Sequence, residues 1–325
     1  MQIAAFPRNG RQVSRLGFGA MGLAGWFGNY SDKDLIASVL HSLESGIDFI
    51  DTARAYGRSE ELLARALKLW KGDAPFIASK INPLGANTKW GCPLPVETIF
   101  PQGHITREID LSLQTLGVER IDLMQLHVYW ATWGVEGYWL DELDEARAAG
   151  KIDLIGISIP DHRHDVALPL VESGRIDSVQ TIVNIFDPFA GDCLIPYCQR
   201  HGVGVIARCI LDEGGLTGFL APDMVFTNTD FRSHYFDSVG RDIYLNRVDA
   251  LRQFIPAHGS SLAALAIKYV LAHPGVTTAI SSMHVQQYAD ENIDATREPP
   301  LSPAIVETLR LHHRWTRNFY ESKYV

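Results

Sequence analysis

The stretch "GIDFIDTARAYGRSE", residues 46–60, holds an apolar strand, a loop and the start of a helix. Ile47, Phe49 and Ile50 make up the strand-like run, which ends in Asp51, and Tyr56 follows in the loop. An apolar strand that leads into a helix is the repeating unit of folds in which helices cover a parallel sheet. The stretch therefore predicts an α/β architecture and places ionisable side chains where the strand ends.

The same unit recurs along most of the chain. Most of the strand-like runs are nearly continuously apolar, as expected when helices cover one face and a packed interior covers the other. These runs are residues 15–20, 47–52, 75–80, 121–127, 152–158, 177–183, 202–208 and 276–281. Eight such strands joined by right-handed crossovers predict a (β/α)8 TIM barrel. A doubly wound open sheet is the alternative, which the lack of a glycine fingerprint after the first strand disfavours.

Amphipathic stretches with proper ends lie between the strands. Residues 31–46 begin at the N-cap candidate Ser31 and end at Gly46, and further helices are expected at 59–70, 107–117, 140–150, 193–202 and 261–275. Residues 84–103 and 212–245 are long loops, a length typical of binding loops or lids. We expect a single domain, residues 1–325, with extended substrate loops and a C-terminal tail.

Composition excludes several classes of protein. Hydrophobic residues make up 46% and charged residues 21% of the chain, which is typical of a soluble globular protein with a large core. A net charge of −9 without a basic cluster argues against nucleic acid or a membrane as partner. The chain also lacks a long apolar span and the layout of a signal peptide.

The four cysteines, Cys92, Cys193, Cys198 and Cys209, show no metal-ligand spacing. We therefore expect reduced thiols, a cytoplasmic location and no metal site. Nothing in the sequence indicates the oligomeric state.

Three successive strand candidates end in an ionisable residue. Asp51 ends the first, Lys80 the second and His127 the third, and Tyr56 lies in the loop after Asp51. In a parallel barrel the carboxyl ends of the strands meet at one rim, where active sites lie. We therefore expect these four side chains to converge.

The four groups together have a defined chemistry. A phenol with a pKa near 10 is a poor proton donor at neutral pH, and a neighbouring lysine ammonium favours the phenolate and lowers that pKa. A carboxylate keeps the lysine charged and oriented, and a histidine donates a hydrogen bond to a carbonyl oxygen. The set predicts a proton donor and an oxyanion-stabilising pair for a carbonyl that receives hydride.

From about Arg15 to about Asn292 the chain resembles the aldo-keto reductase family. The motifs that carry the resemblance are "GIDFIDTARAYGRSE", "FIASK", "LGVERIDLMQLH", "GKIDLIGIS" and "GVGVIARCILDEGGLTG". The resemblance implies a barrel enzyme that moves hydride between a nicotinamide cofactor and a carbonyl. It makes Tyr56 the general acid–base, Lys80 the group that tunes its pKa, Asp51 the partner of Lys80, and His127 the carbonyl-orienting group.

The resemblance also implies a cofactor site. Ser158 fits the position that holds the nicotinamide amide, but Ile159 replaces a common asparagine, which leaves Gln180 and Asn184 for further contacts. Arg208 stands where an aromatic residue often stacks on the nicotinamide; a salt bridge at the rim is the alternative interpretation. The loop expected to wrap the pyrophosphate contains Leu211, Gly214, Gly215, Leu216, Thr217 and Gly218.

The adenosine end departs most from the family pattern. Ser282, His284 and Tyr288 occupy positions where a lysine or arginine usually binds the ribose 2′-phosphate, while Glu291 and the adenine-contacting Asn292 are retained. Ser281, Ser282 and His284 could still bind a phosphate. Because the family favours NADPH, we expect NADP(H), with NAD(H) as the rival.

Aromatic residues gather in the expected substrate loops. We expect substrate contacts from Trp26, Tyr129, Trp130 and Trp315, with Trp90, Phe231 and Tyr320 among other aromatics nearby. Aromatic faces among polar groups suit a sugar-like or polyol-derived aldehyde or ketone. Flat aromatic aldehydes are an equal alternative, and Arg54, Arg58 and Arg232 leave room for an anionic group.

The sequence therefore predicts an NAD(P)-dependent carbonyl or alcohol oxidoreductase with a small-molecule substrate, in carbohydrate metabolism. A cofactor-binding regulatory or redox-sensing subunit is one alternative. An isomerase or epimerase that retains its cofactor is the other.

Overall fold

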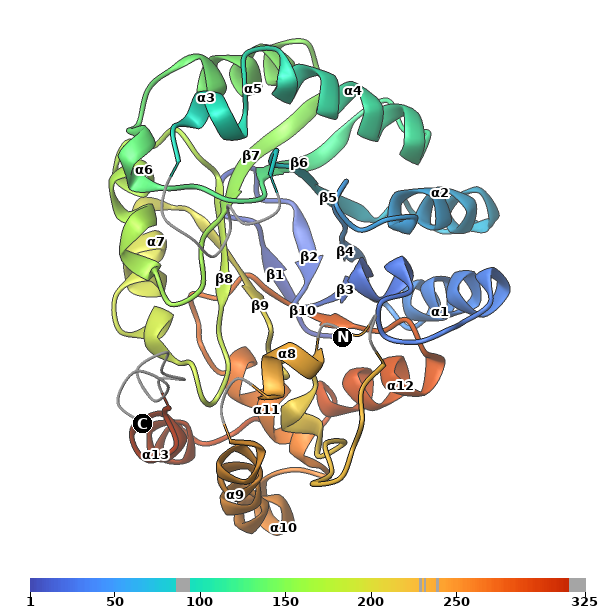
Figure 1. The fold of residues 1–325 in the computed structure, drawn as a ribbon, viewed down its shortest axis with the longest axis vertical. Helices are drawn as coiled ribbons and strands as arrows, with labels where there is room; N and C mark the ends of the chain where they lie inside the picture. Colours follow the sequence, from blue (N-terminus) through green and yellow to red (C-terminus); the bar gives the residue numbers. More distant parts are fainter. Residues whose placement is uncertain (86–93, 228–229, 231, 238–239, 316–325) are drawn as a thin grey trace.

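The computed structural model describes residues 1–85, 94–227, 230, 232–237 and 240–315. Trp90, Cys92, Phe231 and Tyr320 lie outside these residues. Eight parallel strands close into a barrel in the order β10-β3-β4-β5-β6-β7-β8-β9 (Figure 1). They are β3 Leu16–Gly19, β4 Phe49–Asp51, β5 Phe76–Ile81, β6 Ile121–Leu126, β7 Ile152–Ser158, β8 Ser178–Ile182, β9 Gly204–Arg208 and β10 Thr278–Ser282. The predicted (β/α)8 barrel is confirmed, and each predicted strand overlaps an observed one.

Helices surround the barrel, as Figure 1 shows. They are α1 Asp32–Glu44, α2 Ser59–Leu69, α3 Val96–Ile99, α4 His104–Leu116, α5 Tyr138–Ala148, α6 Leu168–Glu172, α7 Leu194–His201, α8 Arg232–Asp237, α9 Arg241–Leu251, α10 Ile255–His258, α11 Leu262–Leu271, α12 Gln286–Ala295 and α13 Pro303–His312. Ser31 caps α1 by accepting a hydrogen bond from the Asp34 backbone nitrogen at 3.2 Å, as predicted.

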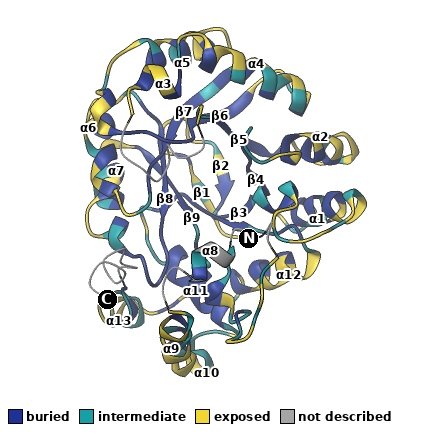
Figure 2. Ribbon diagram, viewed as in Figure 1, coloured by how far each residue is buried: buried dark blue, intermediate teal, exposed yellow. Residues whose placement is uncertain are grey.

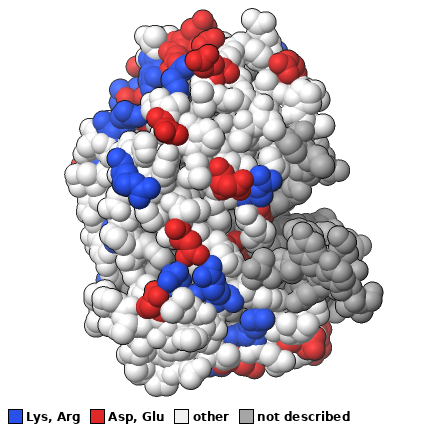
Figure 3. All heavy atoms as spheres, turned by 90° about the vertical axis from the view of Figure 1, so that its left-hand side faces the viewer, with Lys and Arg blue, Asp and Glu red and all other residues white. Residues whose placement is uncertain are grey.

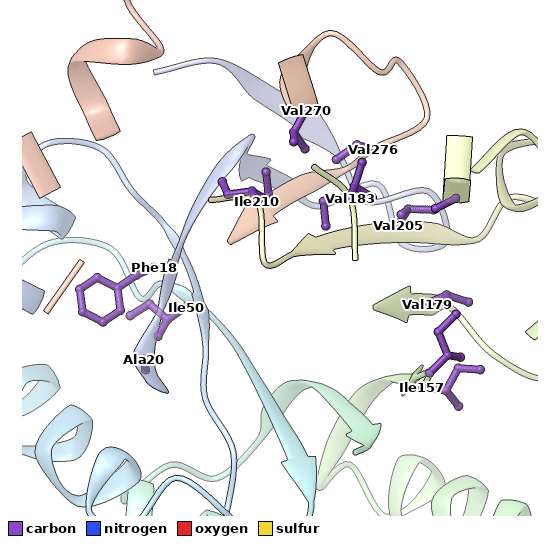
Figure 4. Packing of buried hydrophobic residues seen from close by; sticks show 14 of the residues in the cluster. Phe18, Ala20, Ile50, Ile157, Val179, Val183, Val205, Ile210, Val270 and Val276 are labelled. Carbon is purple, nitrogen blue, oxygen red and sulfur yellow. The ribbon is translucent and has the colours of Figure 1, made fainter. Parts of the chain in front are cut away.

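The barrel strands are largely buried (Figure 2), and two apolar clusters pack against them. Outward-facing strand residues pack against the helices; Phe18 and Ile50, paired on adjacent strands, lie side by side in this first cluster (Figure 4). A second cluster joins inward-facing residues of the strands to the N-terminal segment. Within it the ring of Phe76 stacks between Phe6 and Phe49, with centroid distances of 5.3 and 5.0 Å.

The N-terminal hairpin was not predicted. Strands β1 (Ile3–Ala5) and β2 (Gln12–Ser14) pair antiparallel, and Phe6 and Val13 join the inner cluster. Each strand has only three residues, too few for a period-two pattern to stand out in the sequence. Because Phe6 stacks on Phe76 and Val13 joins the same cluster, the hairpin covers the amino-terminal end of the barrel interior.

The barrel interior changes from apolar to polar along its strands. Side chains two residues apart in a strand share a face, so Asp51 follows Phe49, Lys80 follows Ala78 and Gln125 follows Leu123. Phe49, Ala78 and Leu123 belong to the inner apolar cluster. The polar side chains therefore lie directly above that cluster, at the carboxyl ends of the strands.

The two predicted long loops contain short helices. Residues 84–103 include α3, and residues 212–245 include the 3₁₀ turn η5 (Gly215–Thr217), α8 and the start of α9. These helices leave no sign in the sequence, because helices as short as α3 and α8 carry too few turns for an apolar stripe.

Among the described residues, no single helix is long and apolar enough to cross a membrane, although the bent pair Arg241–His258 and Leu262–Leu271 meets the length and composition test together. Every residue of α11 in that pair is buried. On the face in Figure 3, acidic and basic side chains lie intermingled.

Candidate active site

The structure brings the four predicted catalytic residues together. The Lys80 ammonium donates a hydrogen bond to Asp51, and its Nζ lies 5.1 Å from the centroid of the Tyr56 ring. The Tyr56 ring meets the His127 ring edge to face, with centroids 5.6 Å apart. One strand end and the loop after it supply Asp51 and Tyr56, while β5 and the residue after β6 supply the other two.

The Asp51–Lys80 pair is fully enclosed. Lys80 is 0% and Asp51 1% exposed. Lys80 also donates to the Thr52 carbonyl at 2.9 Å, and the second Asp51 oxygen accepts from Gln180 at 2.8 Å and Gln125 at 3.3 Å. Burial lowers the pKa of Lys80, and the Asp51 carboxylate opposes this. A buried ion pair persists when further hydrogen bonds satisfy its atoms, as they do here.

The electrostatics of Tyr56 differ from the expectation. Burial first, and then the charge of Asp51, raise the pKa of the Tyr56 phenol, while Arg208 lowers it. The Asp51 carboxylate, which accepts a hydrogen bond from Lys80, thus shifts the pKa of Tyr56 in the direction opposite to the effect expected of the lysine. The phenol is therefore firmly protonated at neutral pH, which suits a group that donates a proton.

One cavity of about 700 Å³, called the main cavity here, opens beside Tyr56 and Asp51. It runs from the barrel rim past the loop after β9 to the start of α12. Of the fourteen predicted cofactor residues, those that line it are Gln180, Arg208, Leu211, Gly214, Thr217, Gly218, Ser282, His284, Tyr288, Glu291 and Asn292. Most of the predicted set thus shares one cavity with the Tyr56 phenol.

Three predicted cofactor residues do not line the main cavity. Gly215 and Leu216 are buried behind it, and a Cβ added to Gly215 would lie 1.8 Å from the Tyr244 hydroxyl. Gly215 is thus needed for packing against Tyr244. Ser158 is also enclosed, and its Oγ lacks a hydrogen-bond partner among the described residues. Ser158 is paired in register with Gln180, which lines the cavity. The Ser158 hydroxyl is therefore a hydrogen-bond donor next to the cavity wall.

The glycine-rich turn has the backbone that its sequence suggests. Gly214 and Gly218 have φ of 92° and 80°, in the left-handed region that favours glycine, and they flank η5. Both line the main cavity, so backbone can approach a ligand closely there. The cavity length, this turn and the Ser158 hydroxyl fit an extended dinucleotide with its amide end near Tyr56.

Arg208 and Asn184 make structural contacts. Arg208 donates to Asp161 at 2.5 Å and to the Ile159 carbonyl at 3.1 Å, so the salt bridge at the rim is present, while the side chain also lines the main cavity. The Asn184 amide donates to the Cys209 carbonyl and accepts from two backbone nitrogens, at 3.0, 2.9 and 2.8 Å. Asn184 therefore holds a loop and does not line the cavity.

The predicted substrate residues separate into two groups. Trp26 is 36% exposed and meets Tyr56 edge to face at 6.1 Å, and buried Trp130 lies beneath Arg163, 5.7 Å from its guanidinium. Tyr129 is fully buried and donates to the Gly134 carbonyl at 3.0 Å. Trp315 packs on Phe186 and Tyr244. Trp26 thus lies against Tyr56 and Trp130 against Arg163, while Tyr129 and Trp315 take part in aromatic packing, and none of the four lines the main cavity.

Like Arg232, which pairs with Asp230, the other two arginines considered for an anionic ligand are paired with carboxylates. Arg54 donates to Glu60 at 3.0 Å, and Arg58 donates to Asp32 and Glu61, each at 2.9 Å. Their charges are therefore engaged away from the main cavity, which neither residue lines.

Sequence reasoning missed several residues that line the main cavity. They are Gly19, Met21, Cys209, Ile210, Glu213, Phe219, Ala263 and Ile280; Phe27, Arg232 and Ser281 line the cavity as well. The non-glycine residues Cys209, Asp212 and Glu213 have positive φ. The turn that brings Glu213 to the cavity therefore lacks the glycines that would reveal such a turn in the sequence. Arg232 comes from the long loop whose path the sequence does not indicate.

Comparison with known proteins agrees with this geometry. The profile of the Aldo/keto reductase family matches residues 15–313. The chain is 26% identical over 295 residues to the aldo-keto reductase YhdN of Bacillus subtilis, covering 86% of this chain and 84% of that protein. It is 26% identical over 302 residues to the NADH-specific methylglyoxal reductase of Escherichia coli, covering 87% and 90%.

A solved structure is also similar. The glycerol dehydrogenase of Gluconobacter oxydans superimposes with a TM-score of 0.78 at 25% identity, covering 98% of each chain. Three findings point to the same family: the closed barrel, the family match over residues 15–313, and the convergence of Asp51, Tyr56, Lys80 and His127. The chain belongs to the aldo/keto reductase family of oxidoreductases.

Proposed function

We propose that this protein transfers hydride between a nicotinamide cofactor and the carbonyl of a small aldehyde or ketone, with Tyr56 as the general acid–base. The observation that carries the proposal is the opening of the main cavity beside Tyr56, next to the Lys80–Asp51 pair and the His127 ring. A carbonyl held between Tyr56 and His127 meets a proton donor and a second polar group.

Each residue has a distinct part in the proposal. When bound, the cofactor supplies or accepts the hydride. Tyr56 gives its proton to the carbonyl oxygen during reduction and takes it back from the alcohol during oxidation. His127 orients that oxygen, and Lys80 offers a positive charge to a developing phenolate while Asp51 fixes its position. The enclosure of Lys80 and Asp51 strengthens these interactions because water is excluded.

The proposed substrate is a small hydroxylated carbonyl compound, sugar-like or polyol-derived. Trp26 presents a partly exposed aromatic face beside Tyr56, which suits the apolar face of a polyhydroxylated molecule. Two similar proteins, a methylglyoxal reductase and a glycerol dehydrogenase, are named for small oxygenated substrates. The described cysteines are free thiols, in keeping with a proposed cytoplasmic location.

A spectrophotometric assay with the purified full chain tests the proposal. The absorbance of NADH and NADPH is followed with methylglyoxal, glyceraldehyde, a hexose and benzaldehyde in turn, with Tyr56→Phe as the inactive control. We expect turnover with a hydroxylated aldehyde and none in the variant. Tight cofactor binding without turnover in either direction would favour a regulatory subunit. Conversion of a sugar without net cofactor consumption would favour an isomerase.

A further inference from the structure

We propose that the main cavity selects NAD(H) over NADP(H), because Asp230 neutralises Arg232 and Glu291 faces the cavity at its α12 end. The inference rests on the proposed function, since it takes the nicotinamide to lie at Tyr56 and the adenosine at the other end. It reverses the expectation of NADP(H) drawn from the sequence.

The α12 end of the main cavity lies outside the barrel wall. Ser38 of α1 donates to the Met283 carbonyl, and His41 of α1 contacts Asp290 of α12 at 2.6 Å. Tyr56, by contrast, lies over the barrel rim beside Lys80. A dinucleotide whose reactive ring sits at Tyr56 therefore has its adenosine near Ser282, His284, Tyr288, Glu291 and Asn292.

The charges around the main cavity do not favour an additional phosphate. Among the described residues that line it, the cations are Arg208 and Arg232, and each is paired with a carboxylate, Asp161 or Asp230. Glu213 and Glu291 add carboxyl groups to the same lining. A 2′-phosphate carries nearly two negative charges at pH 7 and is usually bound by arginine or lysine.

The side chain of Arg232 is held in the lining of the main cavity by a carboxylate and two aromatic rings. Its Nε lies 2.9 and 3.1 Å from the two Asp230 oxygens, and its Nη2 lies 2.5 Å from one of them. Its guanidinium also lies 5.0 Å from the Phe27 ring centroid and 5.1 Å from that of Phe219. A phosphate would have to compete with a carboxylate two residues away in the chain, so Arg232 is a poor replacement for the missing family arginine.

His284 also offers no charge. It is 5% exposed, its Nδ1 lies 2.9 Å from Ser282 Oγ, and its Nε2 is buried without a partner among the described residues. Burial, with a smaller contribution from Arg232, lowers the pKa of His284 to about 4. The imidazole is therefore neutral at pH 7, which suits a hydrogen bond to a ribose hydroxyl or to adenine better than binding of a dianion.

Glu291 adds a carboxylate to the α12 end of the main cavity. Because it is retained from the family pattern, it acts together with the lack of an unpaired cation among the described lining residues and not by itself. Glu291 lies one turn after Gln287 on α12. The side-chain amide of Gln287 donates a 2.9 Å hydrogen bond to the Glu291 carboxylate. A carboxylate near the adenosine ribose accepts hydrogen bonds from a 2′-hydroxyl and repels a 2′-phosphate. A 2′-phosphate at this end of the main cavity would therefore meet a carboxylate and no unpaired arginine or lysine among the described lining residues.

Titration of protein fluorescence with NADH and, separately, with NADPH tests the inference without any substrate. The full chain, Glu291→Gln, Asp230→Asn and the matched control Asp290→Asn are compared at fixed ionic strength. Asp290 is the residue before Glu291 on α12, pairs with His41 and does not line the main cavity. It therefore reports the effect of net charge alone.

We expect the unmodified chain to bind NADH at least about tenfold more tightly than NADPH. Glu291→Gln and Asp230→Asn should each narrow that ratio about three- to tenfold, and Asp290→Asn should leave it within about twofold, the scale of single charge interactions near a surface. Tighter binding of NADPH by the unmodified chain, or equal ratios in all variants, would overturn the inference alone. Binding of neither cofactor would overturn the proposed function with it.

Discussion

Gln180 on β8 donates a 2.8 Å hydrogen bond to the Asp51 carboxylate on β4, across the interior of the barrel. The same carboxylate accepts from Lys80 on β5. Asp51 of β4 therefore connects side chains of β5 and β8 and fixes the position of the lysine. Gln180 was expected to contact the nicotinamide amide. In the structure its amide nitrogen instead bonds the Asp51 carboxylate, which in turn accepts from Lys80.

This relationship predicts a positioning role for Gln180. Gln180→Leu removes a buried donor to Asp51 and should slow hydride transfer about tenfold or more, the scale of losing a supporting hydrogen bond behind a reactive group. Gln125→Leu is the comparison, because Gln125 bonds the same oxygen at 3.3 Å and should matter less. Single-turnover absorbance measurements give both rates, and equal rates in the two variants would contradict the prediction.

The four converging residues predict separate effects on chemistry and on cofactor binding. Tyr56→Phe should abolish hydride transfer while the cofactor dissociation constant changes by no more than a few-fold, since only the proton donor is lost. Lys80→Met should lower kcat by at least about two orders of magnitude. Tyr138→Phe is a control, because that hydroxyl donates to the Phe100 carbonyl at 2.6 Å, away from the main cavity. Unchanged turnover in Tyr56→Phe would refute its assignment.

The raised pKa of Tyr56 predicts the pH dependence of the reaction. Reduction needs the protonated phenol, so kcat/KM for reduction should stay level from pH 6 to about pH 9, below the ordinary phenol pKa near 10. Oxidation needs the deprotonated phenol and should rise with pH over the same range. Steady-state kinetics in both directions test this. If the reductive kcat/KM already falls as the pH rises toward 8, Lys80 lowers the pKa of the Tyr56 phenol and the prediction is wrong.

The fold and the convergence of the four proposed catalytic residues were predictable for one physical reason. The strands of a parallel barrel are mostly apolar, and their carboxyl ends lie at a common rim. The positions of Asp51, Lys80 and His127 at or next to strand ends therefore suffice to predict that their side chains lie close together. Ser31 was likewise readable as a cap because its side chain acts within one helical turn.

The remainder depends on contacts between distant segments. Arg232 reaches the main cavity because Phe27 and Phe219, from two other loops, pack against its guanidinium. Tyr129 was expected at the substrate because it follows His127 closely, yet the backbone turns its side chain toward Trp133 and Trp139. Neither placement follows from local sequence, since each is decided by tertiary packing.

The buried imidazole of His284 predicts a pH-dependent stability. Its folded-state pKa of about 4 lies below the ordinary value of 6.5, so the unfolded chain binds the proton more readily. This histidine therefore favours unfolding increasingly as pH falls from about 6.5 to about 4, by up to about 3 kcal/mol at the lower limit. Urea unfolding at pH 7.5 and pH 5 should show a smaller loss of stability on acidification in His284→Gln than in the unmodified chain. His201→Gln, at an exposed histidine, should behave as the unmodified chain does, and equal losses in all three would contradict the prediction.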